Sequence, residues 1–448
     1  MWNRCNQRAA WAVAFSLSLF LITGSRCESA TAKSAGTSPV LVEAHQRVDF
    51  VRKQVTEITR CAEVVAKSWV ENKTVLLHYV YGGSSLNFTA EFCSRAGGLD
   101  NAQPMTVRVP QYTKNDVLVF AQRSWEKGAD DLRKLLKESK ARGWTTIVFA
   151  SRKGMPEDMP IDYLIDNDAP NGSEAGAPMN EITNAINGWV WSGELTAALT
   201  RLGFHPAVLH GMILPGSTAH NKTYQHGSPA LYPIDKDKAV PAGQLGNAYL
   251  DAIGKLLVRL DTPAMRKQIV TAANYATDCI QSGHIVWGIS YTHFLNGYVN
   301  IALKSPMKGL SFSYAEAEHM INSHVKPGDL VFFFGEWTVN TQEYDFVSIL
   351  QKTGAHYITS YRLGKEPLEE PLSNSKQMYS QDMKDALLVI DQPWTFQNAA
   401  IPIPFPPGNM AATSGICAAL IYRELDLAIA TDVAKKGIVA KPPPTATH

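Results

Sequence analysis

Apolar runs and polar turns follow one another along this chain in an order that occurs twice. Residues 114–148 contain an apolar run, a polar turn, a helical stretch that ends at a glycine, and a second β-branched run, and residues 326–359 repeat that order. Two residue pairs mark the repeat, each separated by about 210 residues: Asp116 with Asp329, and Gly143 with Gly354. A constant offset across strand, helix and strand indicates a duplicated α/β unit.

The repeat extends in both directions. Upstream, VRKQV (51–55) recurs as MRKQI (265–269), and each opens a helical segment that leads into an apolar strand. Downstream, residues 162–170 are echoed by 385–393, and an apolar helix follows each. We therefore expect two α/β domains, each with the order helix, strand, strand, helix, strand, strand, helix, covering residues 40–202 and 251–430.

Composition supports a chain built from folded domains. With 448 residues, 45% apolar and 19% charged, the chain is long enough for two ordinary cores rather than one. The net charge is +1 and no basic block is present, so nothing favours nucleic acid or an anionic membrane surface as a partner.

The N-terminus has the pattern of an export signal. Arg4 and Arg8 precede an apolar run from Ala9 to Ile22, and small residues follow at Ala30 to Ala32. The run is shorter than a spanning helix needs, so we expect residues 1–32 to be a cleaved signal peptide. The mature protein is then secreted or periplasmic, with no stable membrane insertion. At the other end, residues 431–448, with three consecutive prolines, are expected to be a disordered tail.

Four cysteines remain in the expected mature chain: Cys61, Cys93, Cys279 and Cys417. No C-x-x-C pair occurs among them, so structural zinc is not expected. An exported protein can form disulfides, but buried helix and strand cysteines are commonly plain core residues, and we favour that interpretation.

The candidate binding residues follow from strand ends. In parallel α/β sheets, ligands bind outside the carboxyl ends of the strands, where loops and helix N-termini present backbone N–H groups. This rule selects two segments in each copy: Gly82, Gly83, Ser84 and Ser85 with Arg123 and Ser124 in the first, and Thr292 and His293 with Glu336 and Trp337 in the second.

The first of these segments resembles a known family. The run YGGSSLNFTAEFCSRAGG (81–98) looks like the phosphoheptose isomerase segment in which Gly-Gly-Ser leads into a helix carrying Ala-Glu-Leu-x-Gly-Arg; here the helix reads Ala90 to Arg95. The resemblance implies sugar isomerase (SIS) domains in tandem: two flavodoxin-like parallel sheets, each in a three-layer α/β/α arrangement, binding phosphosugars. Because members of this family also dimerise, it leaves a homo-oligomer open.

The departures from that family bear on function. Its second loop is rich in Ser and Thr, whereas the loops here read Ala-Gln-Arg-Ser (121–124) and Gly-Glu-Trp-Thr (335–338). Arg123 can pair with an anion, whereas Glu336 would repel one. Thr183 stands where the family carries its catalytic His, so the base for an aldose–ketose isomerisation would be Glu91 or Glu181, with a raised pKa if desolvated.

Each of these residues also has a structural interpretation. Glu91 could be a solvated helix carboxylate that pairs with Arg95 at i,i+4, and Glu181 could simply favour its helix dipole. Glu336 could be an ordinary exposed loop residue. His78 lies within an apolar strand, which favours a hydrogen-bonded core histidine.

The segment between the copies, residues 203–250, is rich in Gly, Pro and His and shows no helical or strand period over most of its length. We expect a linker or lid over the interface. Its histidines, His205, His210, His220 and His226, match no metal motif, so no metal and no cofactor is expected.

Three hypotheses follow. The first is an exported protein that binds a sugar or sugar derivative, with isomerase activity as its enzymatic version. The second is a non-catalytic sugar-binding module on the same fold. The third is a hydrolase or lyase that uses the linker histidines. Export favours an unphosphorylated or unusual ligand, because phosphosugars are scarce outside the cytoplasm.

Overall fold

The structure, a computed structural model, describes most of the chain after the expected signal peptide. The described residues are 37–80, 86–105, 113–126, 128–169, 177–211, 214, 216–224, 227–290, 294–299, 304–337, 341–363, 384–394 and 399–439. The expected signal peptide lies outside them, as does the C-terminal part of the expected tail.

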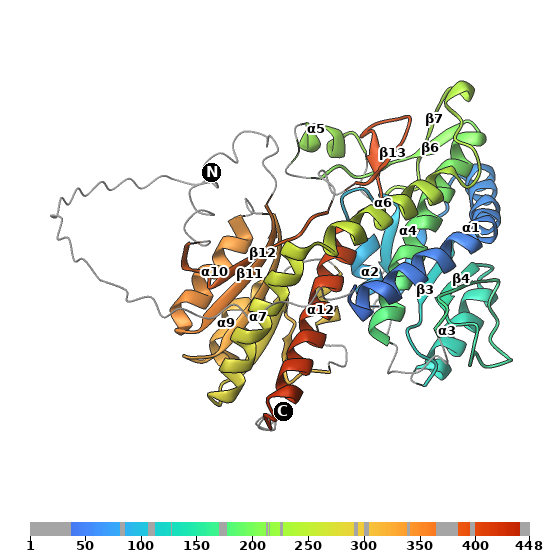
Figure 1. The fold of residues 1–448 in the computed structure, drawn as a ribbon. Coiled ribbons are helices and arrows are strands. Elements are labelled where there is room, and N and C mark those ends of the chain that lie inside the picture. Colours follow the sequence, from blue (N-terminus) through green and yellow to red (C-terminus); the bar gives the residue numbers. More distant parts are fainter. Residues whose placement is uncertain are drawn as a thin grey trace. The chain divides into compact units, whose positions relative to one another are not determined.

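The first copy forms a five-stranded parallel sheet (Figure 1). Its elements, in chain order, are α1 (Pro39–Asn72), β1 (Leu77–Val80), α2 (Leu86–Phe92), β2 (Ala102–Met105), β3 (Val117–Ala121), α3 (Ala129–Ala141), β4 (Thr145–Ala150), β5 (Tyr163–Asp166) and α4 (Ala177–Arg201). The strand order is β2-β1-β3-β4-β5. This is the flavodoxin-like order, in which ligands bind at the switch point between the first and third strands.

The second copy forms an equivalent sheet. Its elements are α7 (Pro263–Gln281), β8 (Val286–Ser290), α8 (Leu295–Tyr298), β9 (Lys308–Leu310), η4 (Tyr314–Glu316), α9 (Ala317–His324), β10 (Leu330–Trp337), α10 (Thr341–Thr353), β11 (His356–Arg362), β12 (Leu388–Asp391) and α12 (Ser414–Lys435). The strand order β12-β11-β10-β8-β9 is the order of the first sheet read from its other edge, and all pairs are parallel. Two flavodoxin-like parallel α/β domains in tandem, the fold that the resemblance implies, are thereby confirmed.

The structure has one more strand in each copy than the order of elements predicted from the sequence. The edge strands β2 and β9 are only four and three residues long. β2 reads Ala-Gln-Pro-Met, which has neither an apolar run nor a period of two, so the pattern along the sequence does not show it.

Side-chain alternation divides the first sheet between two cores. Val117, Val119 and Ala121 of β3 belong to a large cluster that also contains residues of α1 and α4. Leu118 and Phe120 face the other way, into a smaller cluster with α3. The sheet is therefore covered on both faces, which explains its continuous apolar strands.

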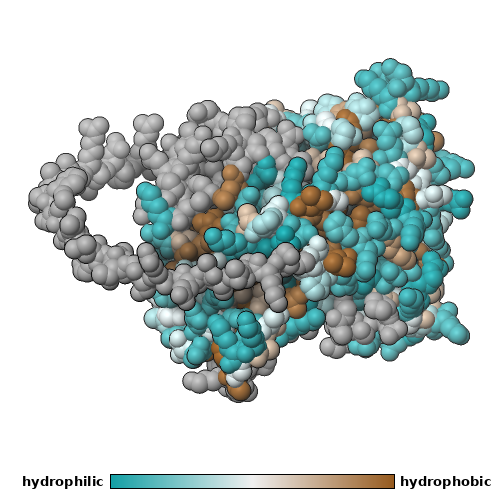
Figure 2. Space-filling view, viewed as in Figure 1, coloured by the Kyte–Doolittle hydropathy of each residue, from teal (hydrophilic) through white to brown (hydrophobic). Residues whose placement is uncertain are grey.

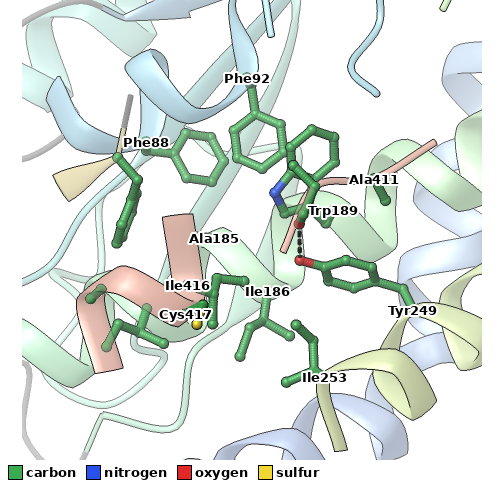
Figure 3. Packing of buried hydrophobic residues seen from close by; sticks show 14 of the residues in the cluster. Phe88, Phe92, Ala185, Ile186, Trp189, Tyr249, Ile253, Ala411, Ile416 and Cys417 are labelled. Atoms are coloured by element: carbon green, nitrogen blue, oxygen red, sulfur yellow. Dashed lines mark hydrogen bonds between the residues drawn. The ribbon is translucent and has the colours of Figure 1, made fainter. Parts of the chain in front are cut away.

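The second sheet contributes to the same large cluster, so the expectation of two separate cores is wrong. Phe332 and Phe334 of β10 join it, whereas Val331 and Phe333 face an outer cluster with α9 and α10. The shared cluster, here called the central core, is filled by α1, α4, α6, α7 and α12. In Figure 3, residues of α2, α4, α6 and α12 meet there. Apolar inner helices pack against one another between the sheets, which merges two cores into one.

The aspartates that mark the repeat hold equivalent structural places. Asp116 accepts hydrogen bonds from the backbone N–H of Leu76 (3.1 Å) and Thr113 (3.0 Å) and contacts Nε2 of His78 at 2.8 Å. His78 is fully buried and stacks on Trp144, so its interpretation as a core histidine is confirmed.

The second copy repeats this arrangement with a different aromatic partner. Asp329 accepts from Ile285 N–H, Lys326 N–H and Trp287 Nε1, each at 3.0 Å. The Arg-Lys-Gln repeat also has a structural role, because the Gln of each copy reaches the last strand of its sheet. Gln54 bonds the backbone of Asp166, and Gln268 bonds the carbonyl of Val389. These bonds satisfy backbone groups on edge strands that would otherwise be open to other chains.

The connecting segment contains more regular structure than expected. Its elements are β6 (Phe204–Pro206), α5 (Ser217–Lys222), β7 (Leu231–Pro233), η3 (Lys236–Lys238) and α6 (Gln244–Leu260), and a further hairpin is formed by β13 (Ile401–Pro402) and β14 (Asn409–Met410). Helix α6 crosses the expected boundary at residue 250, and α12 continues past the expected boundary at 430. From Thr37 onward the chain forms one compact unit.

Hydrophilic side chains cover most of the visible face of the described residues, with apolar residues in small separate groups (Figure 2). None of the described helices is long and apolar enough to cross a membrane. Cys61, Cys93, Cys279 and Cys417 are free thiols. Cys61 and Cys417 are buried in the central core, as expected, whereas Cys93 and Cys279 are half-buried against it.

Candidate functional site

A polar cluster lies at the carboxyl ends of β1 and β3 in the first copy. Arg123 lies two residues after the end of β3, Glu181 lies in the second turn of α4, and Asn87 belongs to α2. Arg123 Nη1 lies 3.3 Å from Glu181 Oε1, and Asn87 Nδ2 donates to Glu181 Oε2. Both carboxylate oxygens of Glu181 therefore accept from side chains. Here this group is called the first strand-end cluster.

Amides of α4 hold the loop after β3 in place. Asn180 Nδ2 donates to the carbonyl of Arg123 at 2.9 Å, and Asn184 Nδ2 donates to the carbonyl of Gln122 at 3.3 Å. Asn180 and Asn184 share one face of the helix because they are four residues apart. Gln122 Nε2 in turn donates to the carbonyl of Ser124. Hydrogen bonds from α4 and from the Gln122 side chain therefore fix the backbone that carries the Arg123 guanidinium.

Two acceptors of this cluster, Asn180 Oδ1 and Asn87 Oδ1, receive no hydrogen bond from the described residues. Asn180 is fully buried, and among the described residues none donates a hydrogen bond to its Oδ1. Arg123 is the most accessible charged residue of the cluster, with 26% of its side chain exposed against 4% for Glu181. The cluster therefore offers an accessible donor, Arg123, to a small polar ligand, whereas its unpartnered acceptor is buried.

A second polar cluster lies at the carboxyl end of β10. Glu336 Oε1 accepts from Arg95 Nη1 at 3.1 Å and from Ser414 Oγ, the first residue of α12, at 3.4 Å. Arg95 Nη2 also donates to Ser414 Oγ. Arg95 follows α2 of the first copy, so this second strand-end cluster joins side chains from both copies.

Glu91 lies beneath this cluster with no exposed surface. Its Oε1 accepts from Trp189 Nε1 at 2.9 Å, and its Oε2 lies 3.5 Å from Arg95 Nε. A Cβ on Gly415 would lie only 2.5 Å from that Oε2, so α12 packs directly against the carboxyl group. Burial raises the pKa of Glu91 to about 7, although the positive charge of Arg95 opposes the shift.

Burial also acts on Arg95. It lowers the pKa of Arg95, but the carboxylates of Glu91 and Glu336 outweigh it, so the pKa is raised. The expected i,i+4 pairing of Glu91 with Arg95 is confirmed, and its expected solvation is wrong. A ligand cannot touch Glu91 unless the side chains packed on it move, which counts against a role as the base.

The two clusters are built around equivalent positions, which hold a positively charged residue in the first copy and a negatively charged one in the second. Val117 begins β3 and Leu330 begins β10, and each pairs with the first residue of the first strand of its copy, β1 or β8. Arg123 and Glu336 therefore occupy the same place, two residues beyond the last matched pair of core positions. In each copy this residue contacts the start of the last helix, through Glu181 in α4 and Ser414 in α12.

Helix α8 of the second copy packs on the first cluster. The Tyr298 hydroxyl donates to the carbonyl of Pro178 at 3.0 Å. A Cβ on Gly297 would overlap Asn87 Oδ1, so only glycine allows this approach. The first cluster therefore also depends on the second copy for its enclosure.

Of the predicted site residues, the structure places Arg123, Ser124, Glu181, Glu336 and the buried Glu91. Four others, Gly82, Gly83, Ser84 and Ser85, lie outside the described residues, as do Thr292 and His293. The backbone of Trp337 ends β10, but its side chain is not described. Glu336 is not an ordinary exposed loop residue, because its side chain is only 15% exposed and paired with Arg95.

Four contributors were not predicted: Asn87, Asn180, Arg95 as the partner of Glu336, and Ser414. Asn180 stands next to Glu181 in a helix start, which is a usable signal. Asn87 is the first residue of an N-x-T sequon, but its side chain is buried.

The linker histidines form ring contacts with neighbouring aromatic side chains. His205 stacks on Phe405 with ring centroids 4.2 Å apart, and His220 meets Tyr224 edge to face at 5.0 Å. Burial lowers the pKa of His205. Within the described part of the chain, no group of three His, Cys, Asp or Glu side chains is arranged to hold a metal ion. His226 lies outside that part.

The two sheets together define a protein with two flavodoxin-like parallel α/β domains in tandem. No protein-family model matches the chain, and no curated protein does. Among solved structures, the chain is similar to the C-terminal domain of glucosamine-fructose-6-phosphate aminotransferase from Francisella tularensis, with 11% identity, 92% of this chain and 100% of that chain covered, and a TM-score of 0.47.

Two further solved structures give the same level of likeness. A provisionally assigned phosphosugar isomerase from Clostridium difficile 630 has 12% identity, coverage of 91% of this chain and 96% of that chain, and a TM-score of 0.47. A provisionally assigned sugar-binding protein from Salmonella typhimurium LT2 has 12% identity, coverage of 88% and 99%, and a TM-score of 0.47. The fold assignment rests on the two sheet topologies described above.

Proposed function

We propose that the protein binds a sugar or sugar derivative at the first strand-end cluster and does so outside the cytoplasm. The observation that carries the proposal is the partly exposed guanidinium of Arg123, held beside Glu181 at the switch point of the first sheet. The hydroxyl and carboxylate oxygens of sugars accept hydrogen bonds, and Arg123 is a donor that reaches the surface there.

The arrangement favours binding over isomerisation. Isomerisation needs a base that reaches the proton between two adjacent carbons. Glu91 has no exposed surface, and Glu181 has both oxygens engaged by Arg123 and Asn87. The chain also has Thr183 in place of the family's histidine. A binding protein therefore fits the described residues better than an isomerase.

A thermal-shift screen tests the binding proposal. The purified protein is mixed with neutral sugars, acidic sugars and sugar phosphates, since a ligand that binds only the folded state raises the melting temperature. We expect neutral or acidic sugars to stabilise the wild type and the control Arg60→Gln, whose side chain is exposed on α1, but not Arg123→Gln. Equal stabilisation of Arg123→Gln, or no response to any sugar, would reject the site.

Isomerisation is the second candidate, because Glu181 is a carboxylate placed within the proposed site. It is tested by following aldose–ketose conversion of each stabilising sugar by NMR. Conversion by the wild type that is lost in Glu181→Gln, with sugar binding retained, would establish the enzymatic version. Absence of conversion in the wild type leaves the binding role, which the thermal shifts decide separately.

A further inference from the structure

Six aromatic rings form a continuous row along the connecting segment. Each ring contacts the next, and the centroids of neighbouring rings lie between 4.2 and 5.7 Å apart. In order along the row, the rings belong to His210, His220, Tyr224, Tyr232, His205 and Phe405. They come from α5, β6, β7 and the residues next to these elements, and from the β13–β14 hairpin (Figure 1). Segments far apart in the sequence therefore build one feature, here called the aromatic row.

The aromatic row differs from the aromatic residues of the central core. Trp189 and Tyr249, which lie in that core (Figure 3), have no exposed surface. In the row only Phe405 is buried, at 6% exposed, and the other five residues are half-buried. Touching rings that are half-exposed form a surface on which a ligand can pack, because covering them removes apolar area from water.

The row also has polar edges. Within the described part of the chain, neither the Tyr224 hydroxyl nor the Tyr232 hydroxyl makes a hydrogen bond. His205 Nδ1 lies 3.0 Å from the carbonyl of Pro206, and a carbonyl only accepts, so Nδ1 carries the proton and Nε2 is an acceptor. Hydroxyls that donate and accept, and an imidazole nitrogen that accepts, therefore lie along the row.

The charge of the row limits the kind of ligand it can bind. None of its six side chains is a Lys, Arg, Asp or Glu. Burial lowers the pKa of His205, which keeps this imidazole neutral at neutral pH. The row therefore lacks the fixed positive charge that binds nucleic acid or an anionic membrane. A matching ligand is neutral, with apolar faces and hydroxyl edges, and sugar rings have that structure.

We propose that the aromatic row binds a neutral oligosaccharide, with successive sugar units packed on successive rings. A chain of sugars matches the row better than a single sugar, because linked units bind neighbouring rings without each losing the translational freedom of a separate molecule. Single sugars are held only at the first strand-end cluster, so titration with a single sugar reports one site per chain. The row shares no residue with that cluster, so oligosaccharide binding does not depend on the proposed function.

Calorimetric titration with neutral hexasaccharides tests the proposal. The probes are cellohexaose, xylohexaose and maltohexaose, and the proteins are the wild type, Tyr232→Ala and the control Tyr275→Ala, an exposed tyrosine on α7. We expect a hexasaccharide to bind the wild type and Tyr275→Ala equally, and Tyr232→Ala about tenfold more weakly, since an aromatic contact at the centre of the row is lost. Tyr232→Phe, which keeps the ring, should bind more tightly than Tyr232→Ala. No binding of any probe to the wild type, or equal binding by Tyr232→Ala, would overturn the proposal.

Tyr224→Ala keeps the test decisive if Tyr232→Ala folds poorly. Tyr224 follows the end of α5, whereas Tyr232 lies within β7. Folded Tyr224→Ala should also bind the hexasaccharide more weakly than Tyr275→Ala, and equal binding by these two variants would reject the row as the site.

Arg123→Gln separates this proposal from single-sugar binding at the first strand-end cluster. The variant should lose single-sugar binding and keep hexasaccharide binding. If Arg123→Gln loses hexasaccharide binding as well, the oligosaccharide binds at that cluster and not on the row. If single sugars fail to bind the wild type while hexasaccharides bind in a Tyr232-dependent way, the first cluster is rejected and the row stands.

Discussion

The two strand-end clusters occupy the same place in two copies of one fold, yet the residue at the strand end is positively charged in the first copy and negatively charged in the second. After β3 of the first copy stands Arg123, partly exposed and paired with Glu181 of α4. At the carboxyl end of β10 in the second copy stands Glu336, paired with Arg95 from the first copy and with Ser414. The first cluster keeps an accessible cation, whereas the second has a buried cation that an internal carboxylate already neutralises.

This difference shows which features the duplication constrains. The positions that build the sheet have kept their roles, since Asp116 and Asp329 bind equivalent backbone groups. The strand ends have diverged, since Arg123 stands in the first copy where Glu336 stands in the second. One copy therefore retains a candidate ligand site, and the other uses the same place to join the copies.

The largest expected effect on stability comes from breaking the ion pair between Arg95 of the first copy and Glu336 of the second. Arg95→Gln leaves the carboxylates of Glu91 and Glu336 without their cation, and removing one partner of a buried ion pair costs about 3–5 kcal/mol. Urea unfolding at pH 8 measures the loss, with Arg60→Gln as the exposed control. A loss below about 1 kcal/mol would show that the second cluster does not hold the copies together.

The next effect is a dependence of stability on pH. The pKa of Glu91 is about 7 in the folded protein against a usual value of 4.5, so the folded state binds the proton more tightly than the unfolded state. The contribution is complete below pH 4.5 and is lost as pH rises through 7, by an amount on the order of 3 kcal/mol.

Unfolding free energies of the wild type and Glu91→Gln at pH 5 and pH 8 measure that contribution. The wild type should lose stability relative to the variant as pH rises, because the amide that replaces the carboxyl group in the variant does not titrate. Parallel pH profiles for the two proteins would mean that Glu91 is ionised throughout and held by Arg95.

The equivalent roles of the two aspartates predict matched effects. Asp116→Ala and Asp329→Ala each remove a buried carboxylate that accepts several hydrogen bonds, with an expected loss of about 2–3 kcal/mol in either copy. Asp237→Ala, on the exposed η3, serves as the control. A large loss of stability from only one of the two substitutions would show that Asp116 and Asp329 do not have the same structural role.

The smallest effect concerns the paired glycines. Gly143 and Gly354 have φ of +83° and +74°, a region where a Cβ is strained. We expect Gly143→Ala and Gly354→Ala each to lower stability by about 1 kcal/mol, measured by urea unfolding. Neutral or stabilising results would show that these turns relax into another conformation.

The sequence was sufficient for the sheets because their strands are buried on both faces and read as continuous apolar runs. It was insufficient for the edges, since β2 and β9 are too short to show a pattern. The shared central core was also not predicted. Apolar helix faces indicate burial, but they do not say whether the partner is a helix of the same copy or of the other.

The same limit applies to the candidate site. The strand-end rule placed Arg123 and Glu336 at the carboxyl ends of β3 and β10, because it depends only on topology within each copy. The pairing of Glu336 with Arg95, and the contact of Gly297 with Asn87, depend on how the copies pack against each other. No spacing within one copy specifies that packing.

The central claim is that each chain has one sugar site, located in the first copy. Calorimetric titration with the sugar that gives the largest thermal shift measures the number of sites and locates them when repeated on Arg123→Gln and Glu336→Gln. The account predicts one site per chain, lost in Arg123→Gln and retained in Glu336→Gln. Two sites per chain, or binding that survives Arg123→Gln and disappears in Glu336→Gln, would contradict it.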